Sequence, residues 1–94
     1  MTNLLIRHKV NDYAAWKVEF DNFADFRRSS GEKSYRILHP EGESNNLTLL
    51  FEWDTPGNAR KFLESTELRS AMQRAGVAEE PEIRFMEEAA QGAL

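Results

Sequence analysis

The apolar residues of this chain repeat every second position in some segments and every third or fourth in others. This change between the period of a strand and that of a helix limits the fold more than any other feature. The segments that alternate as β-strands do are residues 3–10, 34–39, 47–53 and 83–86. One helix is predicted to begin at Tyr13 and stop at Ser29–Gly31, and another to begin after Thr55 and end at Gly76. The predicted order is therefore strand, helix, strand, strand, helix, strand.

Residues that favour helix ends stand at the helix boundaries. Residues 11–12, an Asn-Asp pair, can accept the unpaired amide hydrogens of a first turn. Thr55 followed by Pro56 is a second helix start, because proline lacks an amide hydrogen that would stay unpaired there. The apolar stripe of this second helix loses its phase at Ser65 and Thr66, which predicts a kink with Thr66 capping the following segment.

Two interleaved strand-helix-strand units predict an α+β fold, the ferredoxin-like βαββαβ sandwich. Its four-stranded antiparallel sheet carries the first and third strands side by side and both helices on one face. A length of 94 residues allows one domain, residues 1–94, with a core over about residues 3–88 and a mobile tail from Glu88.

Composition excludes several classes of site and partner. The chain has no cysteine, so disulfides, thiolate metal sites and cysteine nucleophiles are excluded. Its net charge is −4 and its basic residues are scattered, which argues against nucleic-acid binding. No apolar run is long enough for a membrane span or a signal peptide, so a cytoplasmic protein is expected.

Two helices cover only one face of a four-stranded sheet, and the other face would carry Leu5, Arg7, Thr48 and Leu50. A mixed apolar and polar face of this kind can pack against a second copy of the chain, which predicts a homodimer through the sheet face. It can also stay in water, as one face of an antiparallel sheet often does.

His8 is the most informative candidate for chemistry. It lies near the end of the first strand, on the face assigned to the helices, and is predicted to lie near Trp53. A histidine there could act as a general base near neutral pH or orient a ligand hydroxyl. Alternatively it is a buried histidine whose ring bonds to a backbone carbonyl or to Tyr13. The sequence leaves both interpretations open.

Arg27 falls on the apolar side of the first helix, in its last turn. As a binding residue, its guanidinium would hold a carboxylate or enolate oxygen in the cleft between helices and sheet. As a structural residue, its stem covers apolar surface while its head meets carbonyls of the helix end or an acidic side chain.

Six further side chains are candidate walls of a pocket for a flat polycyclic substrate. They are Trp16, Phe20, Trp53, Phe62, Met72 and Phe85. Aromatic residues at helical spacing are also ordinary core residues, and Trp53, at a strand end, is the best placed to be a pocket wall. His39 is predicted at the opposite end of the sheet from His8, and no ligand spacing in the sequence favours a metal site.

Three stretches of the chain resemble the dimeric α+β barrel superfamily, and within it the antibiotic-biosynthesis-monooxygenase-like group. They are residues 7–17, 51–54 and 62–72, in the order found in that group, and the likeness covers about residues 3–88. The superfamily includes oxygenases, haem-degrading enzymes, lactone isomerases and polyketide cyclases, so the resemblance specifies fold better than activity. Haem-degrading members carry a Trp and a haem-ligating His where Phe62 and Met72 stand, so haem degradation is not expected.

The resemblance implies an enzyme without a bound cofactor, of monooxygenase or cyclase type, acting on an aromatic or polyketide-like substrate. His8 would take a proton, Arg27 would steady the resulting anion and Trp53 would stack on the ring. The alternative is a homodimer without activity that binds a small ligand or serves as an accessory subunit.

Overall fold

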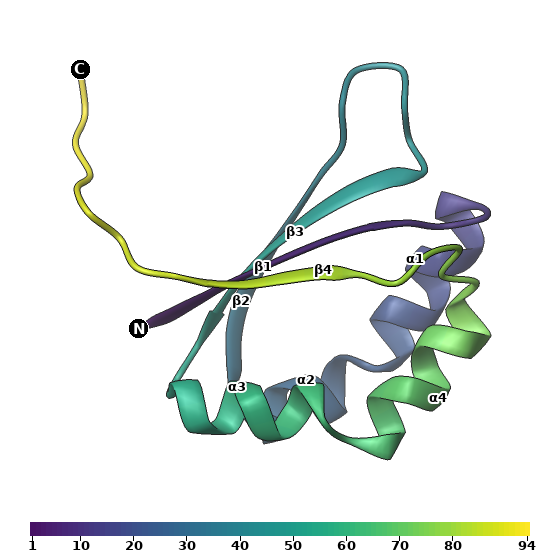
Figure 1. The fold of residues 1–94 in the computed structure, drawn as a ribbon, viewed down its shortest axis with the longest axis horizontal. Helices are drawn as coiled ribbons and strands as arrows, with labels where there is room; N and C mark the ends of the chain where they lie inside the picture. The colour runs from purple at the N-terminus through teal and green to yellow at the C-terminus, as the bar shows by residue number, and fades with distance from the viewer.

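The computed structural model describes residues 1–94, and its elements follow the predicted order (Figure 1). They are β1 (Thr2–Lys9), α1 (Tyr13–Asn22), α2 (Ala24–Ser30), β2 (Glu32–Leu38), β3 (Asn46–Trp53), α3 (Pro56–Leu63), α4 (Thr66–Ala75) and β4 (Glu82–Met86). The four strands form one antiparallel sheet in the order β2-β3-β1-β4, and all the helices lie on one of its faces. The ferredoxin-like βαββαβ fold is thereby confirmed.

The core lies between the helices and the inner face of the two central strands. Every second residue of β1 and β3 is buried, as their alternation predicts. The buried side chains on this face are Leu4, Ile6, His8, Leu47, Leu49, Phe51 and Trp53. Trp16 and Phe20 of α1 and Phe62 of α3 pack against this face from the side of the helices. The inner face predicted from symmetry is therefore the one that the helices cover.

The first helical segment is not one continuous helix. Phe23, with φ of −90° and ψ of 2°, separates α1 from α2. The turn brings the rings of Phe23 and Phe26 into a stack with 4.9 Å between centroids, and both rings pack near Phe62 of α3. Packing of three aromatic rings at one point thus accompanies the break, which helical periodicity alone does not reveal.

The predicted kink of the second helix is present, but its cap is a different residue. Ser65, not Thr66, accepts the Leu68 amide hydrogen through its side chain and precedes α4. Gly76, in the left-handed conformation, ends α4 as predicted. The longest helices have ten residues, and none is long and apolar enough to cross a membrane.

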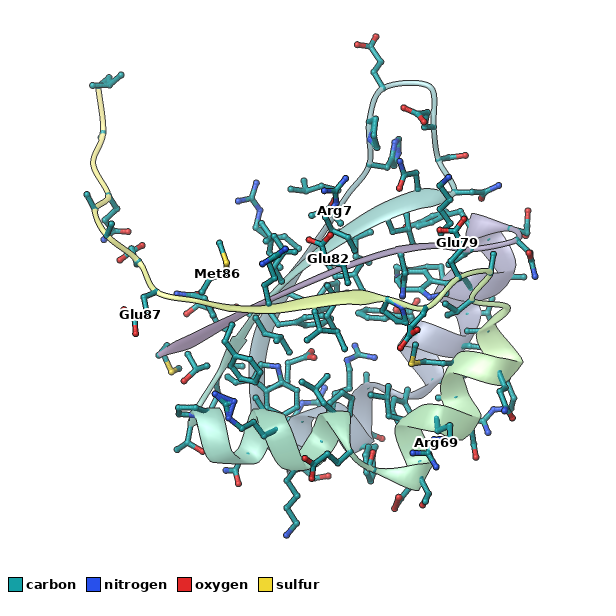
Figure 2. The ribbon with its side chains drawn as sticks, in the orientation of Figure 1. Arg7, Arg69, Glu79, Glu82, Met86 and Glu87 are labelled. Carbon is teal, nitrogen blue, oxygen red and sulfur yellow. The ribbon has the colours of Figure 1, made fainter.

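The outer face of the sheet is uncovered. Figure 2 shows Arg7, Glu82 and Met86 on the side of the sheet away from the helices. Leu5 and Leu50 are paired across β1 and β3 at the centre of this face and are half-buried. The outer face thus mixes apolar and polar side chains, as the sequence indicated.

Gly31 closes the turn between α2 and β2, and we expect it to tolerate no side chain. Its φ is +126°, and a Cβ built there would overlap the carboxylate of Asp54. Gly31→Ala should lower the free energy of unfolding by about 2 kcal/mol, measured by urea denaturation. Gly57→Ala is the matched control, because Gly57 lies in α3, where a Cβ would make only an ordinary contact of 4.0 Å with the Thr55 hydroxyl oxygen, and alanine favours helix. Equal effects of the two substitutions would contradict this explanation.

Candidate functional site

An apolar cavity of about 80 Å³ lies between the inner face of the sheet and the helices. The sheet contributes Ile6, His8, Leu49, Phe51 and Ile83 to its lining. The helices contribute, among others, Trp16, Phe20, Arg27, Phe62, Ala71 and Met72. Ile83 belongs to the edge strand β4 and is 43% exposed, so the cavity is open to solvent on this side.

His8 is the only cavity residue with polar atoms that are both buried and unpaired. Its side chain is 8% exposed, and neither Nδ1 nor Nε2 has a hydrogen-bond partner. The predicted bond to Tyr13 or to a backbone carbonyl is therefore absent. The imidazole instead meets the ring of Trp16 edge to face, with 5.8 Å between centroids and 80° between planes. Because buried polar atoms are normally paired, two free imidazole nitrogens beside a cavity indicate a place for a ligand.

Burial also determines the charge of His8. It lowers the pKa of this imidazole to about 4, because the charged form loses its water. His8 is therefore neutral at physiological pH, with one nitrogen that can accept a proton and one N–H that can donate a hydrogen bond.

We expect this lowered pKa to make the fold less stable in acid. Between pH 6.5, the ordinary value, and about 4, the unfolded chain binds a proton at His8 that the folded chain does not bind. The free energy of unfolding should therefore fall by about 3 kcal/mol as the pH is lowered through this range. Glu32, whose pKa burial raises, contributes with the opposite sign.

The contribution of His8 is measured as the difference between wild type and His8→Leu in urea unfolding at several pH values. The Glu32 contribution is common to both proteins and cancels in this difference. A difference that does not change with pH would contradict the assignment.

Arg27 is held by a buried ion pair. Its Nε lies 3.1 Å from Oε2 of Glu32, and the two side chains are 5% and 7% exposed. Nη1 donates to the carbonyl oxygen of Phe20, and the guanidinium carbon lies 3.7 Å from the centre of the Phe20 ring. These contacts agree with the structural interpretation of Arg27, in which its guanidinium meets an acidic side chain. The Arg27 side chain also lines the cavity.

Of the six candidate wall residues, four line the cavity and two do not. Trp16, Phe20, Phe62 and Met72 line it, and the rings of Trp16 and Phe20 stack with 4.8 Å between centroids. Phe85 lies outside, where the guanidinium of Arg60 covers its ring at 4.1 Å. Trp53 also lies outside and packs on Phe62 with 4.9 Å between centroids.

The prediction that His8 lies near Trp53 is wrong. The two side chains share the inner face, but His8 is paired with Leu47 and Trp53 with Thr2. The two positions are therefore six residues apart along β1, roughly 20 Å. In an antiparallel pair the end of one strand lies beside the start of the other, so the last residue of β3 lies beside the first residue of β1.

The prediction that His39 lies at the opposite end of the sheet from His8 is also wrong. Leu38 and Arg7 are both paired with Thr48, so His39 and His8 lie at the same end, on either side of β3. His39 is exposed and its Nδ1 lies 2.8 Å from the carbonyl oxygen of Pro40, whereas His8 is buried. No cluster of three or more histidine or acidic side chains is arranged to hold a metal ion.

Two acidic residues of this region were not singled out from the sequence. Glu32 neutralises Arg27, and Glu19 lies at the cavity, where its Oε2 is 3.4 Å from Nε of Arg74. This second ion pair joins α1 to α4 beside the cavity. Glu19 falls on the cavity side of α1 only because α4 packs against that helix, a contact that the periodicity of either helix does not show.

Comparison with known proteins identifies the fold and not a close relative. No family model matches the sequence, and no curated protein is significantly similar to it. SnoaB, a cofactor-independent oxygenase from Streptomyces nogalater, superposes with a TM-score of 0.72 at 15% identity, over 94% of this chain and 94% of its own. A candidate antibiotic biosynthesis monooxygenase from Bordetella bronchiseptica gives 0.80 at 14% identity, over 95% and 97%.

The same fold also occurs in a protein of unknown function from Nitrosomonas europaea, with a TM-score of 0.72 at 13% identity, over 99% of this chain and 93% of that one. At such identities the similarity establishes the fold alone. The predicted resemblance to antibiotic-biosynthesis-monooxygenase-like proteins is confirmed at that level.

Proposed function

We propose that this protein is an enzyme without a bound cofactor that removes a proton from a weakly acidic aromatic substrate, with His8 as the general base. The observation that carries the proposal is the neutral, buried His8 at an apolar cavity, with both ring nitrogens unpaired. That SnoaB, of the same fold, is described as a cofactor-independent oxygenase supports this reaction class.

The buried position of His8 determines which substrates it can deprotonate. Its pKa of about 4 makes His8 a weak base. An anion formed beside the imidazolium stabilises the charged ring, and so raises its pKa within the complex. Proton transfer is thus favourable only to the extent that the product anion stays in contact with His8.

The anion would then react directly with molecular oxygen. For an activated CH₂ group, the carbanion reduces oxygen, one oxygen atom becomes the new carbonyl and the other leaves as water. The overall change, CH₂ plus O₂ to C=O plus H₂O, balances without an added reductant. Trp16 and Phe20, whose stacked rings line the cavity, would form the flat wall against the substrate ring. The sequence predicted this role for Trp53.

Turnover of anthrone-type and quinol-type substrates tests the proposal, with oxygen uptake recorded in the presence of a chelator. Oxygen consumption above the rate of spontaneous oxidation, with at least one of these two substrate types, is the expected result. Tight binding with no product would instead support the alternative, a ligand-binding protein without activity.

We also propose that two copies associate through the outer face of the sheet. The central leucines of this face, Leu5 and Leu50, are surrounded by Arg7, Arg36 and Glu52, which can pair with charges on a second copy. Leu50→Glu should shift the sedimentation coefficient from dimer to monomer. Val18→Glu is the matched control, because Val18 is 58% exposed on α1, on the helical side of the sheet. A wild-type protein that sediments as a monomer would overturn this proposal.

A further inference from the structure

The charged side chains that line the cavity, Arg27 and Glu19, both have partners, whereas His8 has none. Arg27 uses Nε on Glu32 and Nη1 on the carbonyl of Phe20. Glu19 is paired with Arg74. His8 alone has buried ring nitrogens without partners, and its imidazole meets the ring of Trp16 edge to face. A ligand that enters the cavity is therefore recognised by hydrogen bonding at His8.

The charges around the cavity favour a neutral ligand. The positive charge of Arg27 is already compensated by the carboxylate of Glu32, and the remaining lining is mostly apolar. A permanently charged group would lose its hydration on entering without gaining an opposite charge that is free to pair with it. An uncharged hydroxyl loses much less, and it can donate its hydrogen to the neutral imidazole.

The volume of the cavity limits the ligand to one ring. About 80 Å³ is roughly half of the ~150 Å³ of a buried cavity known to accept benzene. It is also well below the ~300 Å³ at which sites for larger ligands begin. One ring can enter if part of it remains at the open side beside Ile83, whereas a polycyclic molecule cannot be enclosed.

From these three observations we infer that the cavity binds the ring of an uncharged monocyclic phenol, with its hydroxyl donating to His8 and its ring against Trp16 and Phe20. The inference names the substrate class of the proposed function and rests on the same site. It replaces the polycyclic substrate expected from the sequence with a smaller one.

The test is a set of ligands of matched size, with affinities from titration calorimetry on the wild-type chain at neutral pH. Phenol is the probe, toluene lacks the hydroxyl, benzoate is charged and 1-naphthol has a second ring. Phenol should bind about tenfold more tightly than toluene, the effect of one buried hydrogen bond. Benzoate and 1-naphthol should both bind more weakly than phenol. Toluene or benzoate binding as tightly as phenol would overturn the inference, as would tighter binding of 1-naphthol.

The two histidines provide a matched pair of variants. His8→Leu should weaken phenol binding about tenfold and leave toluene binding unchanged, whereas His39→Leu, at an exposed position, should change neither. If His8→Leu does not fold, the NMR signals of the histidine ring nitrogens in the wild-type protein are the alternative measurement. Phenol should shift only the signals of His8. Phenol binding that shifts neither ring, or only His39, would contradict the assignment.

The outcomes separate this inference from the proposed function. Phenol binding at His8 without oxygen uptake from any substrate would refute the proposed reaction and keep the ligand class. Turnover of larger substrates with no binding of phenol would keep the reaction and refute the ligand class.

Discussion

Replacing His8 with glutamine is expected to lower kcat by about 100-fold or more for any substrate that the wild-type protein turns over. A general base contributes roughly 10² to 10⁴ in rate, and no other unpaired base lines the cavity. Glutamine keeps a hydrogen-bonding group of similar length but cannot accept the proton. The effect should therefore appear in kcat more than in KM.

The measurement is steady-state oxygen uptake for wild type, His8→Gln and the control His39→Gln. The control should keep wild-type activity, because His39 is exposed and lies outside the cavity lining. The kcat/KM of wild type should fall only as the pH approaches 4, since this parameter reports the base of the free enzyme. A His8→Gln variant as active as wild type would refute the proposed role of His8.

Replacing Arg27 with methionine should lower the free energy of unfolding by about 3–5 kcal/mol. The substitution leaves the Glu32 carboxylate buried without its cation, and removal of one partner of a buried ion pair has a cost of this size. It also removes the contact of the guanidinium with the Phe20 ring. Glu32 would then be expected to take up a proton on folding, which is a second observable.

Arg28→Met is the matched control, one residue along the same helix. The Arg28 side chain is 72% exposed and its partner Asp25 is 96% exposed, so the loss should be within about 0.5 kcal/mol. The double variant Arg27→Met with Glu32→Leu should recover much of the stability, because it removes both buried charges. Equal stability of Arg27→Met and Arg28→Met, measured by urea unfolding, would show that the ion pair does not stabilise the fold.

The sequence predicted which side chains face the helices, because the alternation along a strand is a local property. Leu4, Ile6 and His8 are buried together for this reason. It did not predict where residues of different strands lie along the sheet. The antiparallel pairing of β1 with β3 places His8 and Trp53 at opposite ends of β1, which the alternation within each strand does not show.

The partner of Arg27 could not be found in this way. Counting back from Tyr35, which is paired with Phe51, strict alternation would turn Lys33 inward and Glu32 outward. An irregularity in the register between Glu32 and Ser34 reverses this order, and it places Glu32 opposite Trp53 on the inner face. Such a bulge depends on the tight turn at Gly31 and on its neighbours in space, so the pattern of apolar residues does not reveal it.

The two tryptophans occupy opposite ends of the same inner face, and this separation has an evolutionary consequence. Trp53 is completely buried against Phe62 and does not line the cavity, whereas Trp16 forms part of the cavity beside His8. Substitutions around Trp16 can therefore accumulate and change the preferred ligand while the Trp53 end keeps the chain folded. Paralogues of this protein should vary most around the first tryptophan and least around the second.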